Sequence, residues 1–254
     1  MKITFLGTGT SQGIPVIGCG CKVCHSSDQR DNRLRVSLLI EIDDTTIVID
    51  SGPDFRYQML RQKVMDLDAI LFTHEHKDHV AGLDDIRPFN YILKKHIAVY
   101  ATSQVQAALK REFSYIFSDV KYHGLPQIVL HTINDKPFDV LGTKVTPIEV
   151  MHHKLPVTGF RINDFTYITD AKTITEESLL KISGTKILVI NALQKEDHVS
   201  HLTFNEAIAL ANKIGAEKTY FTHMSHTLGL HSEIEKELPP HINLAYDGLS
   251  FEVV

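Results

Sequence analysis

The sequence of 254 residues has no tryptophan, only three cysteines, no long apolar run and no excess of basic residues. Apolar runs such as Ile187–Ile190 fall far short of the roughly 20 residues that a membrane-spanning helix needs, so we expect no membrane partner. The formal net charge of −5 leaves no electrostatic footprint for nucleic acid, so we expect none to bind. Three cysteines do not suggest a disulfide framework, and Met1–Gly7 lacks the longer apolar core of a signal peptide. We therefore expect a cytoplasmic protein.

Hydrophobic periodicity predicts a mixed chain of short strands and helices, with no linker-like segment to divide it. The predicted strands are 2–7, 37–42, 46–50, 69–73, 97–100, 128–132, 144–151, 159–162, 165–169, 186–190, 219–222, 242–246 and 250–253. The predicted helices are 55–64, 84–93, 103–117, 175–182, 204–214 and 232–238, and Thr175 and Thr203 begin sequences that resemble capping boxes. Strands gather in two halves, each with its own helices, which favours two sheets packed face to face with helices outside. We expect a single domain over residues 1–254.

Histidine is abundant, with 15 residues, and its densest group lies in the segment 73–79, Thr-His-Glu-His-Lys-Asp-His, after a predicted buried strand. Side chains alternate along an extended chain, so His74 and His76 point to the same side, and a turn would bring Asp78 and His79 beside them. These four donors exceed what one metal ion with an open position needs, and they suit two ions that share a cleft. The alternative is a solvated polar loop, which rarely follows a core strand with such ligand spacing.

Three further candidate ligands, His152, Asp170 and His223, each follow a strand-like run. Residues at strand ends that face a common edge are where a scaffold gathers a site. Taken singly, each would be an ordinary capped or solvated polar residue, but the repeated context points to one site. His153 adjoins His152 and either could be the ligand, although His152 keeps the strand register with Val150.

The histidine-rich segment and these later residues resemble the metallo-β-lactamase superfamily, which has an α/β fold, a four-layer αββα sandwich with a dinuclear metal cleft. The resemblance implies ligands for two divalent ions (zinc, manganese or iron): His74, His76 and His152 for one, Asp78, His79 and His223 for the other, with Asp170 bridging both. Asp50, at the end of a predicted strand, fits the family's aspartate that orients the site through hydrogen bonds to ligands. The implied reaction is hydrolysis by a metal-bound hydroxide formed between the two cations.

All three cysteines lie in the pattern Cys19-x-Cys21-x-x-Cys24. Thiols this close are typical of metal ligands, but a closed tetrahedral zinc site needs a fourth donor. His25 is adjacent to Cys24, and consecutive residues seldom reach one tetrahedral centre without strain; His226 is the other candidate. The alternative is three unliganded thiols in a reducing compartment.

The glycine-rich stretch 7–15 and the cysteines after it resemble the phosphoribosyl 1,2-cyclic phosphate diesterases of the carbon–phosphorus lyase pathway. They also resemble a protein of pyrroloquinoline quinone biosynthesis that shares the cysteine motif. Likeness to the diesterases extends along nearly the whole chain, including 201–205, 222–226 and 246–248. It implies a structural zinc in an N-terminal loop of about residues 18–26, with ligands Cys19, Cys21, Cys24 and His226. It also gives His201 a role as phosphate contact or general acid, whereas His201 could equally be an ordinary residue at a helix start.

We therefore predict a metal-dependent phosphodiesterase that opens a small cyclic phosphate of the phosphoribosyl type, with Asp78, His201 and Asp50 in the reaction. The alternatives are other small phosphodiesters such as cyclic nucleotides, or an accessory role in quinone-cofactor biosynthesis. Many true β-lactamases carry a cysteine where Asp170 is the expected bridge, which argues against lactam hydrolysis. The sequence has no Gly/Lys-rich arm of the kind that a tRNA-processing nuclease carries, and the resemblance allows a homodimer.

Overall fold

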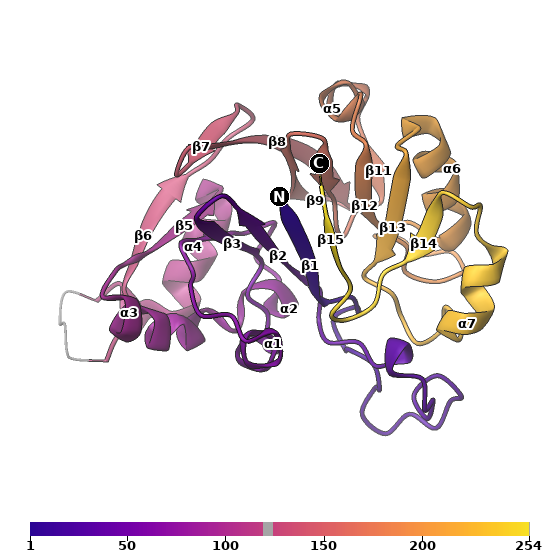
Figure 1. The fold of residues 1–254 in the computed structure, drawn as a ribbon, viewed down its shortest axis with the longest axis horizontal. Coiled ribbons are helices and arrows are strands. Elements are labelled where there is room, and N and C mark those ends of the chain that lie inside the picture. Colours follow the sequence, from indigo (N-terminus) through magenta and orange to yellow (C-terminus); the bar gives the residue numbers. More distant parts are fainter. Residues whose placement is uncertain (119–123, 254) are drawn as a thin grey trace.

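The computed structural model of the chain describes residues 1–118 and 124–253, which form two mixed β-sheets with helices on their outer faces (Figure 1). This arrangement confirms the predicted α/β four-layer αββα sandwich. Within the described residues the first sheet has the strand order β15 (Ser250–Glu252), β1 (Lys2–Gly7), β2 (Ser37–Ile42), β3 (Thr45–Ile49), β4 (Ala69–Leu71), β5 (Ile97–Ala101) and β6 (Ile128–Thr132). The second has the order β11 (Thr173–Ile174), β8 (Thr143–His152), β9 (Leu155–Ile162), β10 (Phe165–Tyr167), β12 (Ile187–Asn191), β13 (Lys218–Thr222) and β14 (Ile242–Leu244), with β7 (Phe138–Val140) paired to β8.

Three apolar cores hold the four layers together. The central core joins the inner faces of the sheets, where residues such as Phe5 and Ile47 meet Phe160 and Tyr167. A second core packs the first sheet against α1 (Phe55–Gln62), α2 (Lys77–Val80), α3 (Arg87–Leu93) and α4 (Ser103–Glu112). A third packs the second sheet against α5 (Glu176–Ile182), α6 (Phe204–Ile214) and α7 (His231–Ile234). No helix of the described residues has the length and apolar character that crossing a membrane requires.

The predicted elements differ from the structure mainly at their ends. The predicted helix 84–93 is a 3₁₀ turn (Leu83–Ile86) followed by α3, because Pro88 stands in the first turn of α3 and suits a helix start. The predicted helix 103–117 ends as α-helix at Glu112 and continues as a 3₁₀ turn (Ser114–Ile116). The short strands β7 and β11 carry too few residues for a periodic signal. Thr203 and Glu206 form the predicted capping box of α6.

Strand ends of both sheets deliver the candidate ligands to one edge. Strands β3, β4 and β5 run parallel, as do β10, β12 and β13. Three of the candidate site residues follow such strands: Asp50 and His223 come directly after β3 and β13, and Asp170 comes shortly after β10. All three have a left-handed backbone, with φ of 61° (Asp50), 55° (Asp170) and 56° (His223). This conformation costs non-glycine residues free energy, on the order of 1–3 kcal/mol each, and such strain clusters at functional sites. The sharp turns therefore mark the edge at which these side chains meet.

The two loops that follow β3 and β4 touch through their backbones. A Cβ atom at Gly52 would lie 2.1 Å from the carbonyl oxygen of Asp78, and one at Gly82 would lie 2.1 Å from the carbonyl oxygen of Gly52. Only glycine permits this approach. It fixes the loop that carries Asp50 against the segment that carries Asp78 and His79.

Candidate metal centre

Asp50 is buried and organises the start of the histidine-rich segment. Its carboxylate accepts hydrogen bonds from the backbone N–H and the hydroxyl of Thr73, at 2.9 and 2.8 Å, and faces Nδ1 of His79 at 2.7 Å. Burial raises the pKa of Asp50, and the neighbouring His79 opposes this rise. Because the carboxylate accepts, Nδ1 of His79 carries the hydrogen and Nε2 is directed away from Asp50 into the site.

Nε2 of His79 lies 3.3 Å from a carboxylate oxygen of Asp78 and 3.3 Å from one of Asp170. Burial opposes a charge on this ring, but the carboxylates of Asp170, Asp78 and Asp50 outweigh it and raise the pKa of His79 well above its usual range. This position therefore attracts a cation, whether a proton or a metal ion.

Asp170 is buried at the centre of the cluster. One of its carboxylate oxygens lies 3.1 Å from Nδ1 of His223 and accepts a hydrogen bond from Thr169 at 2.7 Å, and the other lies 3.8 Å from Nδ1 of His201. Burial alone would raise the pKa of Asp170, but the imidazoles of His223 and His79 hold it well below its usual range. One carboxylate thus contacts histidines delivered by both sheets.

The rings of His74, His76 and His152 are neighbours, and His74 and His152 each share a donor group with Asp170. Nε2 of the buried His74 faces Nδ1 of His76 at 3.0 Å, and the His76 ring is centred 5.2 Å from that of His152. Nδ1 of His152 is 3.2 Å from the carbonyl oxygen of Asp170, so it donates there and leaves Nε2 free. His153 is exposed in the turn between β8 and β9, so the geometry favours His152.

The described residues contain three cleft groups whose donor atoms lie within 4.8 Å of one another: His74, His79 and Asp170; Asp78, His79 and His223; His152, Asp170 and His201. The second group matches the ligand set that the resemblance implies for one ion. His74, His76 and His152 do not form one of these groups, but Nε2 of His74 lies 3.0 Å from Nδ1 of His76, and the His76 ring is centred 5.2 Å from that of His152. His201 shares a group with His152. Burial and the adjacent His223 lower the pKa of His201 to about 3, so its ring is neutral.

Sequence reasoning missed three side chains that border the cluster. The His198 ring is centred 5.0 Å from that of His201, and the spacing His198-x-x-His201 is the signal that could have indicated it. The Thr10 hydroxyl lies 3.2 Å from Nε2 of His223, and Thr169 contacts Asp170. Neither threonine belongs to a pattern that is specific for a site.

The cleft fits divalent metal ions by the chemistry of its donors. Nε2 of His79 and Nδ1 of His201 are buried, yet neither has a hydrogen-bond partner among the described residues. Buried polar atoms normally have hydrogen-bond partners, so the unpaired Nε2 of His79 beside two carboxylates indicates the position of a cation. Nδ1 of His201 is left for a partner from outside the chain. Mixed imidazole and carboxylate donors suit zinc, manganese or iron.

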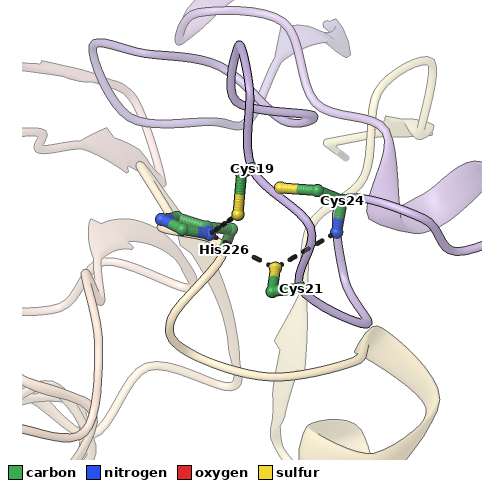
Figure 2. A group of neighbouring side chains, drawn as sticks. All are labelled: Cys19, Cys21, Cys24 and His226. Carbon is green, nitrogen blue, oxygen red and sulfur yellow. Dashed lines mark hydrogen bonds between the residues drawn. The ribbon is translucent and has the colours of Figure 1, made fainter.

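The cysteines form a separate group with His226 (Figure 2). Sγ of Cys19 and Sγ of Cys21 both lie 3.4 Å from Nδ1 of His226, and Figure 2 shows Cys24 beside them. The backbone N–H of Cys24, together with His226, lowers the pKa of Cys21 to about 6, whereas burial raises the pKa of Cys24 to about 11. His25 is exposed, and its Nδ1 lies 3.2 Å from the carbonyl oxygen of Cys21. Three thiols and one imidazole suit a closed structural zinc site.

The family model described as a beta-lactamase superfamily domain matches residues 45–224. A crystal structure of a diphosphatase from the PhnP family is 38% identical, with a TM-score of 0.93 over 100% of this chain and 98% of its own. The chain therefore belongs to the beta-lactamase superfamily and, within it, to the PhnP family. The fold is that of a metallo-hydrolase, which implies divalent metal ions. The structure of Zn²⁺-bound PqqB from Methylobacterium extorquens shares the fold at 19% identity, with a TM-score of 0.81 over the full length of both chains.

One curated relative carries a different name. A protein of Porphyromonas gingivalis named octanoyltransferase is 41% identical over 98% of this chain, but the match spans only 51% of that protein. A ribonuclease Z of Methanosarcina acetivorans is 27% identical over 64% of this chain and 48% of its own length. The chain spans about half the length of the first curated relatives it matches, so their names describe longer proteins.

Proposed function

We propose that the chain is a phosphodiesterase that opens a small cyclic phosphodiester of the phosphoribosyl type, with two divalent metal ions in the cleft. The observation that carries this proposal is the placement of the Asp170 carboxylate, which shares one donor group with His74 and His79 and another with His152 and His201. Whole-chain likeness to a PhnP-family diphosphatase supports phosphoryl chemistry. When bound, the metal ions would polarise a phosphoryl oxygen and lower the pKa of a water molecule.

We assign the following roles to the chain's own residues. One ion would be held by Asp78, His79 and His223, and the other by His74, His76 and His152. Asp170 would bridge the two ions. Asp50 holds the hydrogen on Nδ1 of His79 and so keeps Nε2 available as a ligand. His201 presents Nδ1 without a hydrogen-bond partner beside Asp170, which suits a contact to a phosphoryl oxygen of the substrate.

A cavity of about 290 Å³ near the histidine-rich segment has both polar and apolar lining residues, although none of the candidate ligands lines it, and it could take the organic part of such a substrate. Its lining includes Gln104, which donates to Glu75 at 2.8 Å, and Thr158, whose backbone N–H donates to the carbonyl oxygen of Thr73 at 3.0 Å. Asn134 and Glu149 add an amide and a carboxylate. The polar members of this lining could pair with the hydroxyls of a sugar, which agrees with a sugar phosphodiester.

We further propose that Cys19, Cys21, Cys24 and His226 hold a structural zinc. In the chain, the thiols come from the loop before β2, and His226 follows His223 by three residues. The zinc would therefore fasten this N-terminal loop to the segment that positions a cleft ligand. A small-molecule substrate, rather than RNA, also agrees with the acidic net charge of −5.

The direct test measures turnover of 5-phosphoribosyl 1,2-cyclic phosphate, cyclic nucleotides, bis(p-nitrophenyl) phosphate and lactones by protein reconstituted with Zn²⁺, Mn²⁺ or Fe²⁺. We expect the cyclic sugar phosphate to be preferred and Asp170→Ala to abolish activity. Asp164→Ala is the matched control, because Asp164 lies at the opposite end of β10 and pairs with Lys186 at the surface. Absence of any phosphodiester turnover would refute the proposal, whereas preference for cyclic nucleotides would support the alternative substrate. Full activity of Asp170→Ala would overturn the ligand assignment.

A further inference from the structure

The loop between β12 and α6 carries His198, which is half-buried and lies three positions before His201. Backbone hydrogen bonds hold this loop in place. The N–H of Leu193 donates to the carbonyl oxygen of Leu202 at 3.0 Å, and the N–H of Leu202 donates to the carbonyl oxygen of Ala171 at 2.8 Å. Because Ala171 directly follows the proposed bridging carboxylate in the sequence, the loop has a fixed position relative to the metal centre.

The hydrogen-bond partners of His198 leave its Nε2 unused. The backbone N–H of Ser200 donates to Nδ1 of His198 at 3.3 Å. A backbone N–H can only donate, so Nδ1 accepts and the hydrogen of a neutral ring is on Nε2. Burial, together with the nearby His152 and Lys172, lowers the pKa of His198, which agrees with a neutral ring. Within residues 1–118 and 124–253, Nε2 of His198 has no hydrogen-bond partner, and unlike Nδ1 of His201 it is not shut off from solvent.

His198 and His201 form a pair of imidazoles beside the metal ligands. Their rings are centred 5.0 Å apart with an angle of 40° between the ring planes. The His201 ring is in turn centred 4.4 Å from that of His152 and 4.9 Å from that of His223. Nδ1 of the buried His201 also has no partner among the described residues. The pair therefore offers two ring nitrogens that the chain itself does not use, next to the ligands of the cleft.

The charges around His198 leave its Nε2 to a ligand. Lys172 is close enough to lower the pKa of His198, but its Nζ lies 2.8 Å from both carboxylate oxygens of Glu206 and is held there. A phosphoryl group presents several oxygens that accept hydrogen bonds, so two separate nitrogens can contact it at once. The carbonyl group of a lactone has one oxygen and cannot satisfy both in the same way.

We propose that His198 is a specificity-determining residue that donates a hydrogen bond from Nε2 to a phosphoryl oxygen of the substrate, beside the contact made by His201. The inference rests on the proposed function and deepens it, because it adds a second imidazole contact to the same phosphoryl group. Such a contact favours phosphodiesters over lactones, since a site built around two donors loses affinity when one of them is left unpaired. His198 neither binds the metal ions nor transfers a proton in this assignment.

The first test measures the binding of inorganic phosphate to the metal-loaded protein by isothermal titration calorimetry, which needs no turnover. A hydrogen bond to a charged group corresponds to roughly 10- to 100-fold in an equilibrium constant, so His198→Ala should bind phosphate at least about 10-fold more weakly than wild type. His198→Gln keeps an N–H donor near the position of Nε2 and should recover part of the affinity. Metal analysis should show the same metal content in both variants as in wild type.

The matched control is His241→Ala, which also removes a histidine. His241 directly precedes β14, at the end of the parallel strands opposite to His223, and its Nε2 lies 3.1 Å from the side-chain oxygen of Asn212. This variant should bind phosphate as wild type does. Circular dichroism verifies that each variant is folded. Equal phosphate affinity in His198→Ala and wild type, or a loss of metal from His198→Ala, overturns the inference.

The second test compares the steady-state kinetics of the same proteins with 5-phosphoribosyl 1,2-cyclic phosphate. Removing a contact that is equally strong in the ground state and the transition state raises KM and leaves kcat unchanged, which is the result we expect for His198→Ala. A lower kcat with an unchanged KM would contradict the inference, because it would indicate proton transfer by His198. If wild-type protein binds phosphate through His198 but cleaves no phosphodiester, the proposed function is refuted and the inference about His198 stands.

Discussion

Replacing Asp50 by asparagine tests how the site is prepared for a metal ion. The substitution keeps the shape of a buried side chain but exchanges one accepting oxygen for an NH₂ group. In the wild-type chain, the two carboxylate oxygens of Asp50 accept hydrogen bonds from the backbone N–H and the hydroxyl of Thr73 and from Nδ1 of His79, at 2.7–2.9 Å. An asparagine side chain has only one accepting oxygen and cannot accept all three of these hydrogen bonds. Either Thr73 loses its acceptor, or Nδ1 of His79 accepts a hydrogen bond from the amide and the ring carries its hydrogen on Nε2.

A hydrogen on Nε2 removes the lone pair that would bind the ion held by Asp78, His79 and His223. A hydrogen bond to a charged group contributes about 1.5–3 kcal/mol, which corresponds to roughly 10- to 100-fold in an equilibrium constant. Loss of an outer partner of a ligand costs about the same factor in metal affinity. We therefore expect Asp50→Asn to bind metal in the cleft about 10- to 100-fold more weakly and to lose activity in parallel.

The assay is competition with a chromophoric chelator, together with metal content after dialysis and urea denaturation. Ser37→Ala is the control, because the Ser37 hydroxyl donates to the backbone carbonyl of Asp50 at 2.8 Å and leaves its carboxylate intact. This control should lose stability, by about 1 kcal/mol, but keep its metal affinity. Unchanged metal affinity in a folded Asp50→Asn protein would refute the reasoning about the His79 hydrogen.

Three further predictions concern the cysteine group and the buried network around Arg33. Cys21→Ser should lose one zinc per chain in metal analysis while the cleft keeps its ions, and an unchanged metal content would argue against the structural zinc. Arg33 is buried and donates to Thr8, to the carbonyl oxygen of Ala245 and to His231, so Arg33→Met should lower the free energy of unfolding by about 3 kcal/mol or more in urea titrations. A loss below about 1 kcal/mol would mean that the network relaxes around the gap. Burial and Arg33 lower the pKa of His231, so the unfolded chain binds the extra proton and stability falls as the pH drops below about 6.5. His231→Gln should make the fall between pH 7 and pH 5 shallower, and an equal slope in both proteins would exclude His231 as a contributor.

Local signals in the sequence are enough to find most of the candidate ligands. Apolar runs identified the buried strands, and the polar residues at their ends were visible without any knowledge of the sheets. The reason is physical: strand periodicity and the turn after a strand are determined by neighbouring residues. The predicted ends of elements were less reliable, because a helix that breaks into a 3₁₀ turn, as before Arg87, differs little in its pattern from a continuous one.

Only the tertiary structure decided which of these residues meet. The thiols of Cys19 and Cys21 lie more than 200 positions from His226 in the sequence, yet the fold brings each of them to 3.4 Å from its Nδ1. The hairpin turn separates His152 from His153, since the side chain of one enters the cleft and the other is exposed. His201 groups with His152 and Asp170, which no local pattern specifies. The sequence by itself therefore determined the donors and the strand ends that present them. The packing of the two sheets determined which donors share a site, because contacts between segments that are distant in the sequence depend on how the sheets pack against each other.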